Sequence, residues 1–105
     1  MPAVCRQDDA LTTGHECDGT STLAAPDQTK VYVEDKLVAR KGDSTNSHNT
    51  QTGTDENGDP ICTPHTASII GSSSKVYVVD KLIARVGDAV DAGSLTSGSS
   101  KVFSG

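Results

Sequence analysis

A repeated stretch of fourteen residues constrains this fold more than any other feature. KVYVEDKLVARKGD runs from Lys30 to Asp43 and KVYVVDKLIARVGD from Lys75 to Asp88, with eleven of the fourteen positions identical. A further Lys-Val-aromatic start occurs at residues 101–103, and a further ending of the same kind occurs at residues 4–9. Residues 101–103 have the start of the repeat without its ending, and residues 4–9 have the ending without its start. The two ends of the sequence together would therefore complete a third copy. Such self-similarity predicts a circular, pseudo-threefold object made from one chain.

Each complete copy has the pattern of a β-hairpin. Residues 30–33 alternate polar and apolar side chains, as a half-buried strand does, and residues 37–40 run back beside them. Asp35 and Asp80 stand where the tight turn is needed, and Asp tolerates the left-handed backbone of such turns. Helix signals are almost absent. We therefore predict an all-β fold of hairpin repeats in a single domain over residues 1–105.

The composition provides little material for an apolar core and excludes several classes of partner. Hydrophobic residues make up 33% of the chain, with no Trp, two Tyr and one Phe, so a metal or a partner surface is needed for stability. The net charge is −5 and the Lys and Arg residues are scattered, which argues against nucleic acid and anionic membranes. The N-terminal sequence has no signal-peptide pattern, so we expect retention in the cytosol or export without a cleaved signal.

Three histidines and one cysteine predict a metal site. Two of the histidines follow the repeat ending at nearly the same distance, six and five residues after its Asp, whereas the third copy has Gly93 there. The remaining histidine lies three residues after a cysteine, in the sequence ICTPH. Three imidazoles and one thiolate suit tetrahedral zinc. We therefore predict one zinc per chain, with iron as an alternative, held by His15, His48, Cys62 and His65.

The other two cysteines have different expected roles. Cys5 aligns with Ala39 and Ala84 in the repeat, so we expect a small buried side chain there. Cys17 lies two residues from His15 and competes with Cys62 for the role of thiolate ligand.

A closed four-ligand site leaves no position for substrate, so we expect a structural zinc and no enzyme. A small zinc hydrolase would instead need an open coordination site. A thiol-redox or metal-storage protein would show labile metal and reversible oxidation of Cys17 or Cys62.

The repeat resembles the PAAR-repeat family in its K-V-Y-V-x-D-K-L-x-A-R-x-G-D copies, the MPAV start and ICTPH. This resemblance implies a small cone of β-hairpins with pseudo-threefold symmetry, stapled near its tip by a zinc on three His and one Cys. By motif position the zinc ligands are again His15, His48, Cys62 and His65. The sequence departs from the family at Asp8, which replaces a Gly, and in its Leu-Val-Ala-Arg and Leu-Ile-Ala-Arg motifs.

The resemblance further implies a structural spike-tip protein. Such proteins cap and sharpen a homotrimeric β-helical spike, one tip per trimer, are otherwise monomeric, and meet the target-cell membrane only transiently. Both ends of the sequence lie within the repeat, which favours the tail tip of a contractile phage, and thus a virion location. The alternative is a type VI secretion tip that binds a VgrG trimer, made in the bacterial cytoplasm and exported by that machine.

Overall fold

The predicted all-β fold is confirmed in the computed structural model, which describes residues 2–104. Ten strands form five two-stranded antiparallel sheets over that range, and it contains no helix able to cross a bilayer. The strand pairs are β1 (Ala10–Thr12) with β2 (Thr20–Thr22), β3 (Tyr32–Val33) with β4 (Lys36–Leu37), β5 (His48–Thr54) with β6 (Pro60–His65), β7 (Tyr77–Val78) with β8 (Lys81–Leu82), and β9 (Ala89–Val90) with β10 (Gly93–Ser94).

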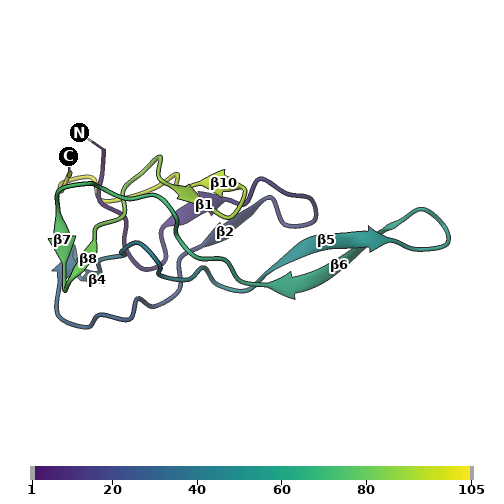
Figure 1. Ribbon diagram of the computed structural model, residues 1–105, viewed down its shortest axis with the longest axis horizontal. Helices are drawn as coiled ribbons and strands as arrows, with labels where there is room; N and C mark the ends of the chain where they lie inside the picture. The colour runs from purple at the N-terminus through teal and green to yellow at the C-terminus, as the bar shows by residue number, and fades with distance from the viewer. Residues whose placement is uncertain (1, 105) are drawn as a thin grey trace.

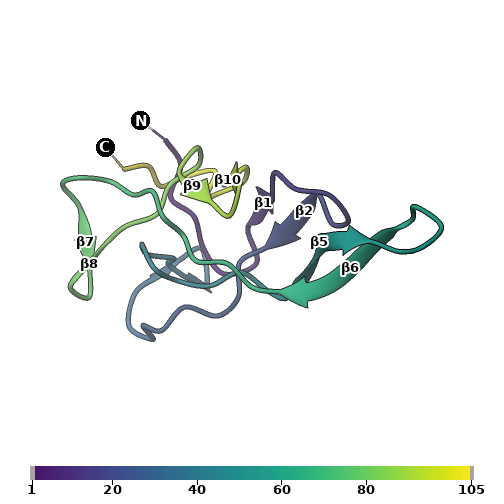
Figure 2. The same ribbon diagram turned by 45° about the vertical axis from the view of Figure 1, so that its right-hand side comes forward.

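The molecule is elongated, with different hairpins at its two ends. Its principal extents are 49 × 24 × 21 Å, and the hairpin β5–β6 projects along the long axis (Figure 1). The hairpin β7–β8, strand β4 and both termini lie at the opposite end. The hairpins β1–β2 and β9–β10 occupy the middle, where Leu11 and Leu95 form a bridge between them (Figure 2). The short repeat hairpins and the long hairpin are therefore separated along the axis.

The two complete repeats form the hairpins β3–β4 and β7–β8, as predicted from the sequence. In each two-residue turn both residues have positive φ, namely 51° and 66° at Glu34 and Asp35, and 48° and 67° at Val79 and Asp80. This is the type I′ backbone that matches the twist of two-residue hairpins. Asn and Gly are the usual residues in such turns, so Val79 holds a conformation that β-branched residues rarely adopt.

The segments near the two ends of the chain pair with each other as the two halves of a repeat do, as the partial copies in the sequence predict. Ala3 pairs with Phe103 in an antiparallel bridge, and the Val4 N–H donates to the Val102 carbonyl at 3.0 Å. In the first complete repeat the equivalent bond joins the Val38 N–H to the Val31 carbonyl at 3.1 Å. The first and last residues of the repeat pattern are thus neighbours in space.

Three backbone hydrogen bonds form a closed ring where the three repeats meet. Cys5 N–H donates to the Ala84 carbonyl, Ala84 N–H to the Ala39 carbonyl, and Ala39 N–H to the Cys5 carbonyl, each at 3.0 Å. All three residues are buried, at 0%, 1% and 0% exposure for Cys5, Ala39 and Ala84. A larger side chain at any of them would overfill the ring. The expected core position of Cys5 is therefore confirmed.

A turn of Arg-x-x-Asp follows each of the three ring residues. The Arg N–H donates to Oδ2 of the Asp at 2.7 Å in every copy, and the Asp N–H donates back to the Arg carbonyl at 3.0 to 3.1 Å. The third turn residue has φ of 72° at Asp8, 94° at Gly42 and 93° at Gly87, so Asp8 keeps the backbone of the glycines that it replaces. The three turns are Arg6–Asp9, Arg40–Asp43 and Arg85–Asp88.

The apolar core is small and lies around the ring. Its central cluster contains buried residues from the repeat endings and from the segments that follow them, and a second cluster lies toward the repeat hairpins. Apart from Cys and Ala, both clusters consist of Leu, Ile and Val side chains. None of these residues belongs to β5 or β6, so the long hairpin lies outside the core. The central cluster consists of Cys5, Leu11, Leu23, Ala39, Ile69, Ala84, Val90 and Leu95.

Candidate metal centre

The three histidines predicted as metal ligands come together where the long hairpin joins the body of the molecule. His48 begins β5 and His65 ends β6, and the two are direct cross-strand partners. His15 lies in the loop between β1 and β2. The fourth member of the cluster is Asp91, in the turn between β9 and β10, where its φ is 55°. Three separate hairpins thus contribute to one group of side chains.

The donor atoms converge on a common point. His65 Nε2 lies 3.0 Å from His15 Nε2 and 2.9 Å from His48 Nε2. Oδ2 of Asp91 lies 2.8 Å from Nε2 of His15, 2.9 Å from that of His48 and 3.2 Å from that of His65. His48 is the most buried of the four, with 3% of its side chain exposed, whereas 32% of the His65 side chain is exposed.

Backbone carbonyls fix the orientation of two of the imidazoles. Nδ1 of His15 lies 3.0 Å from the Glu16 carbonyl, and Nδ1 of His48 lies 3.0 Å from the Asn46 carbonyl. A carbonyl oxygen only accepts, so each Nδ1 carries the hydrogen, and in the neutral ring Nε2 presents a lone pair. Outer hydrogen bonds of this kind position histidine ligands in metal sites.

The cluster favours positive charge at its centre. Burial lowers the pKa of His15, but the Glu16 carbonyl and the Asp91 carboxylate outweigh this and raise the pKa overall. Burial likewise raises the pKa of Asp91, yet the contacts with His48 and His15, whose Nε2 atoms donate to the carboxylate when the rings are protonated, outweigh it and lower the pKa below the usual value. Both directions favour an ionised carboxylate beside the imidazoles, which would attract a cation, either a proton or a metal ion.

The four groups fit a metal ion by their chemistry and their spacing. Imidazole nitrogens and a carboxylate oxygen are ordinary zinc ligands, and bonds of about 2.0 Å in a tetrahedron separate the ligands by about 3.3 Å. The five measured separations lie between 2.8 and 3.2 Å, so a small outward adjustment would admit the ion. The group of His15, His48, His65 and Asp91 could therefore hold a metal ion.

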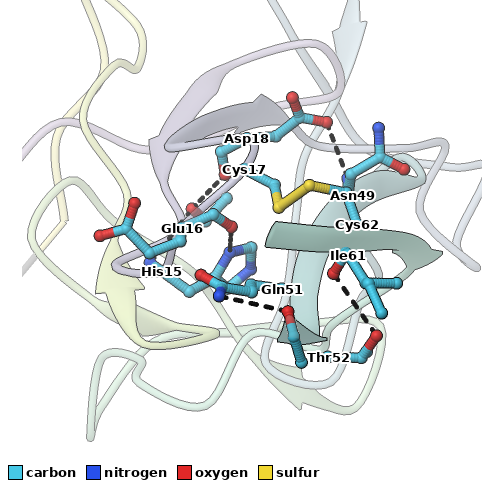
Figure 3. Close-up of a disulfide and its surroundings, with 11 residues drawn as sticks. His15, Glu16, Cys17, Asp18, Asn49, Gln51, Thr52, Ile61 and Cys62 are labelled. Carbon is cyan, nitrogen blue, oxygen red and sulfur yellow. Dashed lines mark hydrogen bonds between the residues drawn. A yellow bond between two sulfur atoms is a disulfide. The ribbon is translucent and has the colours of Figure 1, made fainter. Parts of the chain in front are cut away.

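Cys62, the predicted thiolate ligand, is placed outside this cluster. It forms a disulfide with Cys17, the residue that competed with it for the same role, at a sequence separation of 45 (Figure 3). Successive side chains of a strand point to opposite faces. Cys62 and His65 are three residues apart on β6, so their side chains lie on opposite faces of the strand. Because His65 faces the cluster, Cys62 faces away from it. In this structure Asp91 stands in place of the predicted thiolate.

Asp91 was missed because the repeat alignment considered only histidine at the third position. Alignment by distance from the repeat ending placed Gly93 there, and Gly93 has no ligand atom. The turn between β9 and β10 is short, so its candidate ligand comes three residues after Asp88 rather than five. A search for any metal-ligating residue in the third loop would have found Asp91.

Comparison with known proteins gives no independent identification. No family model and no curated protein matches the sequence. The resemblance of the repeat to PAAR proteins therefore stays a prediction.

Proposed function

We propose that this protein is a structural, non-enzymatic spike tip, which caps a homotrimeric β-helical spike of a contractile phage tail. The observation that carries the proposal is a set of three matching apolar pairs on the repeat hairpins. Each pair is a Val followed by an aromatic residue at the start of a repeat, and each is exposed. The pairs are Val31–Tyr32, Val76–Tyr77 and Val102–Phe103, which we call the apolar pairs.

The apolar pairs have closely similar exposure and similar support. The three Val residues are 36%, 37% and 39% exposed, and the aromatic residues 58%, 65% and 49%, in chain order. In each copy the Val N–H donates to a side-chain oxygen of a residue three positions earlier, which is Gln28, Ser73 or Ser99, at 2.8 to 3.1 Å. Exposed apolar residues presented three times in one way suit a partner with three equivalent contacts.

The closed ring at Cys5, Ala39 and Ala84 supports the same proposal, because it arranges the three repeats around one point. A single chain that meets a trimer on its axis needs similar surfaces three times. The ring and the three Arg-x-x-Asp turns supply that internal repetition. A cap would also cover the unpaired strand edges at the end of a β-helix, which otherwise invite association.

The metal centre supports a mechanical role for the opposite end of the molecule. We propose one zinc per chain, held by His15, His48, His65 and Asp91, with iron as the alternative ion. A zinc ion on these four groups would tie the β1–β2 loop, the β5–β6 hairpin and the β9–β10 turn together where the core is thin. The chain's own carbonyls and cross-strand pairing orient the donors, and rigidity at the tip would serve transient passage through a membrane.

Stoichiometry with a trimeric spike tests this function. The isolated chain should be monomeric. When it is mixed with a homotrimeric β-helical phage spike protein, native mass spectrometry should show one chain per three spike chains. Replacing Tyr32 and Tyr77 with Asp should abolish the complex, because two of the three contacts then bury a charge. Ile61→Asp is the matched control, since Ile61 is 43% exposed on β6 and should leave binding unchanged.

The outcome also separates the two cellular settings. A complex only with a phage spike would support the virion location, and a complex only with a VgrG trimer would support type VI secretion from the bacterial cytoplasm. A 3:3 complex, or no complex with either trimer, would contradict the spike-tip function.

A further inference from the structure

The Cys17–Cys62 disulfide joins two of the segments that carry the metal-binding side chains. Cys17 lies two residues after His15 in the β1–β2 loop, and Cys62 lies three residues before His65 on β6. The bond therefore connects the loop of one ligand to the strand of another (Figure 3). Neither sulfur belongs to the group of donor atoms, so the bond can act on the metal only by positioning the loop.

The histidines differ in how firmly the fold holds them without this bond. His48 and His65 belong to the paired strands β5 and β6, whose hydrogen bonds fix them relative to each other. His15 lies in a stretch with no strand of its own, between two residues of positive φ, Gly14 at 73° and Cys17 at 80°. A short loop with such a backbone depends on its anchors for a single conformation.

The backbone contacts of the His15 loop lie at its two ends. The Ala92 N–H donates to the Thr13 carbonyl at 2.9 Å, the Thr13 N–H donates to the Gly19 carbonyl at 3.0 Å, and Cys17 forms a bridge with Thr50. Asp18 accepts the Asn49 N–H on its carboxylate at 2.7 Å and donates its own N–H to the Asn49 carbonyl at 3.1 Å. The Thr13 hydroxyl donates to the Asp18 carbonyl at 2.6 Å. The disulfide is the covalent link between this loop and β6. His15 otherwise meets β6 through the contact of its Nε2 with that of His65, at 3.0 Å. The disulfide can therefore restrict the position of the His15 side chain relative to the other three metal-binding side chains.

We propose that the Cys17–Cys62 disulfide is a redox-operated clamp on the metal centre. With the bond intact, His15 is held in the cluster and the metal is bound tightly. Reduction by two equivalents of a small thiol yields two cysteine thiols and one small disulfide, frees the loop and weakens metal binding. The proposal rests on the metal centre in the proposed function and adds its regulation.

The clamp links metal binding to the chemical compartment. A reducing cytosol keeps thiols reduced, whereas environments outside the cell are oxidising. A chain made in the cytosol would hold the metal weakly as a dithiol. Thiol–disulfide exchange with a small-molecule disulfide outside the cell would then close the bond and tighten the site.

The test is zinc affinity of the isolated chain in the two redox states, measured by competition with a chromophoric chelator. The oxidised chain should bind zinc about 10-fold or more tightly than the same chain reduced with a phosphine, the usual scale for removing a group that orients a ligand. The double variant Cys17→Ser, Cys62→Ser should bind zinc as weakly as the reduced chain, and its zinc affinity should not change when the phosphine is added. Cys5→Ala is the matched control, because it removes the third thiol and should respond like the parent chain.

Cobalt substitution distinguishes the clamp from direct ligation by sulfur. The clamp predicts no cobalt–thiolate absorption in either state. Equal zinc affinities in the two states would overturn the proposal, and so would tighter binding on reduction with a thiolate band. Zinc binding in neither state would overturn the clamp and the metal centre together. Failure to bind a trimeric spike would contradict only the spike-tip function, because the affinities are measured without a partner.

Discussion

His48 and His65 are cross-strand partners at the base of the β5–β6 hairpin, with their Nε2 atoms 2.9 Å apart. Direct partners in an antiparallel pair share a face of the sheet, so one hairpin supplies two converging imidazoles. His15 and Asp91 then approach from two other hairpins. The long hairpin lies outside the apolar core. These side chains, the disulfide and the hydrogen bonds between Asp18 and Asn49 attach it to the rest of the molecule.

Asp91 is expected to be a metal ligand, which the substitution Asp91→Asn tests. Asn keeps the size of the side chain and tolerates the positive φ of this position, so the backbone should not change. Loss of the carboxylate charge should weaken zinc binding by about 100-fold. This is the upper end of the affinity loss, about 10- to 100-fold, that follows removal of a group that only orients a ligand. Asp59→Asn, in the exposed turn of the long hairpin, is the control. Equal zinc affinity in Asp91→Asn and the parent chain would exclude Asp91 from the site.

Metal binding should stabilise the fold through His48. At a free zinc concentration of 100 times the dissociation constant, the linkage contributes about 2.7 kcal/mol to the free energy of unfolding. For a domain of this size that corresponds to a rise in melting temperature of roughly 10–20 °C. His48→Ala should melt at one temperature with zinc or chelator. If the parent chain melts at the same temperature with zinc and with chelator, the metal does not stabilise the fold.

The histidines of the candidate site were largely predictable, because the repeat register places His15 and His48 at similar positions after the Arg-x-x-Asp turns. His65 was found through a neighbouring cysteine, and for a reason that the structure does not support. The C-x-x-H spacing brings two ligands together in a turn, but the same spacing on an extended strand separates them. The sequence alone does not predict a strand at residues 60–65, because this stretch contains two prolines and proline argues against a strand.

The repeat also predicted the hairpins and the meeting of the termini, because identical turn and strand patterns recur at fixed positions. The disulfide was not predicted, because Cys17 and Cys62 were treated as rivals for one metal position. Two cysteines that compete for the same place in space are also close enough to bond to each other. The long hairpin was not predicted, since the polar residues 48–54 lack the apolar alternation of a half-buried strand.

Cys5 should be inert in the folded protein. Its side chain is 0% exposed and its Sγ donates to the Ser97 carbonyl at 3.3 Å. Burial, together with the nearby Asp9 and Asp88 carboxylates, raises the pKa of the Cys5 thiol to about 12. At pH 8 only about one thiol in ten thousand is then ionised, and the thiolate is the reactive form.

A thiol titration checks the prediction for Cys5 and the disulfide together. An oxidised chain should show no reactive thiol when folded, one in denaturant, and three in denaturant after reduction. Two reactive thiols in the folded chain without reductant would show that Cys17 and Cys62 are unpaired.

Val79 should be a site where stability can be gained. Its φ of 48° is costly for a β-branched residue, and a type I′ turn prefers Asn at this position. Val79→Asn should raise the free energy of unfolding by about 1 kcal/mol, the lower end of the cost of such strain. The bond from Arg40 Nη1 to the Val79 carbonyl, at 2.9 Å, involves only the backbone and should persist.

Val79→Ala is the control for this turn, because Ala removes the same exposed side chain but gains little from a positive φ. Chemical denaturation should rank Asn above both Ala and the parent Val. A less stable Val79→Asn chain would mean that the Val side chain contributes more than its backbone strain costs.

The most direct test of the account is the metal content of the untagged, oxidised chain, purified without chelator and analysed for elements. The account predicts one metal ion per chain, with zinc as the expected ion, and loss of that ion in His48→Ala. A folded chain with the Cys17–Cys62 bond intact that retains no metal, even after incubation with zinc, would contradict the metal centre of His15, His48, His65 and Asp91.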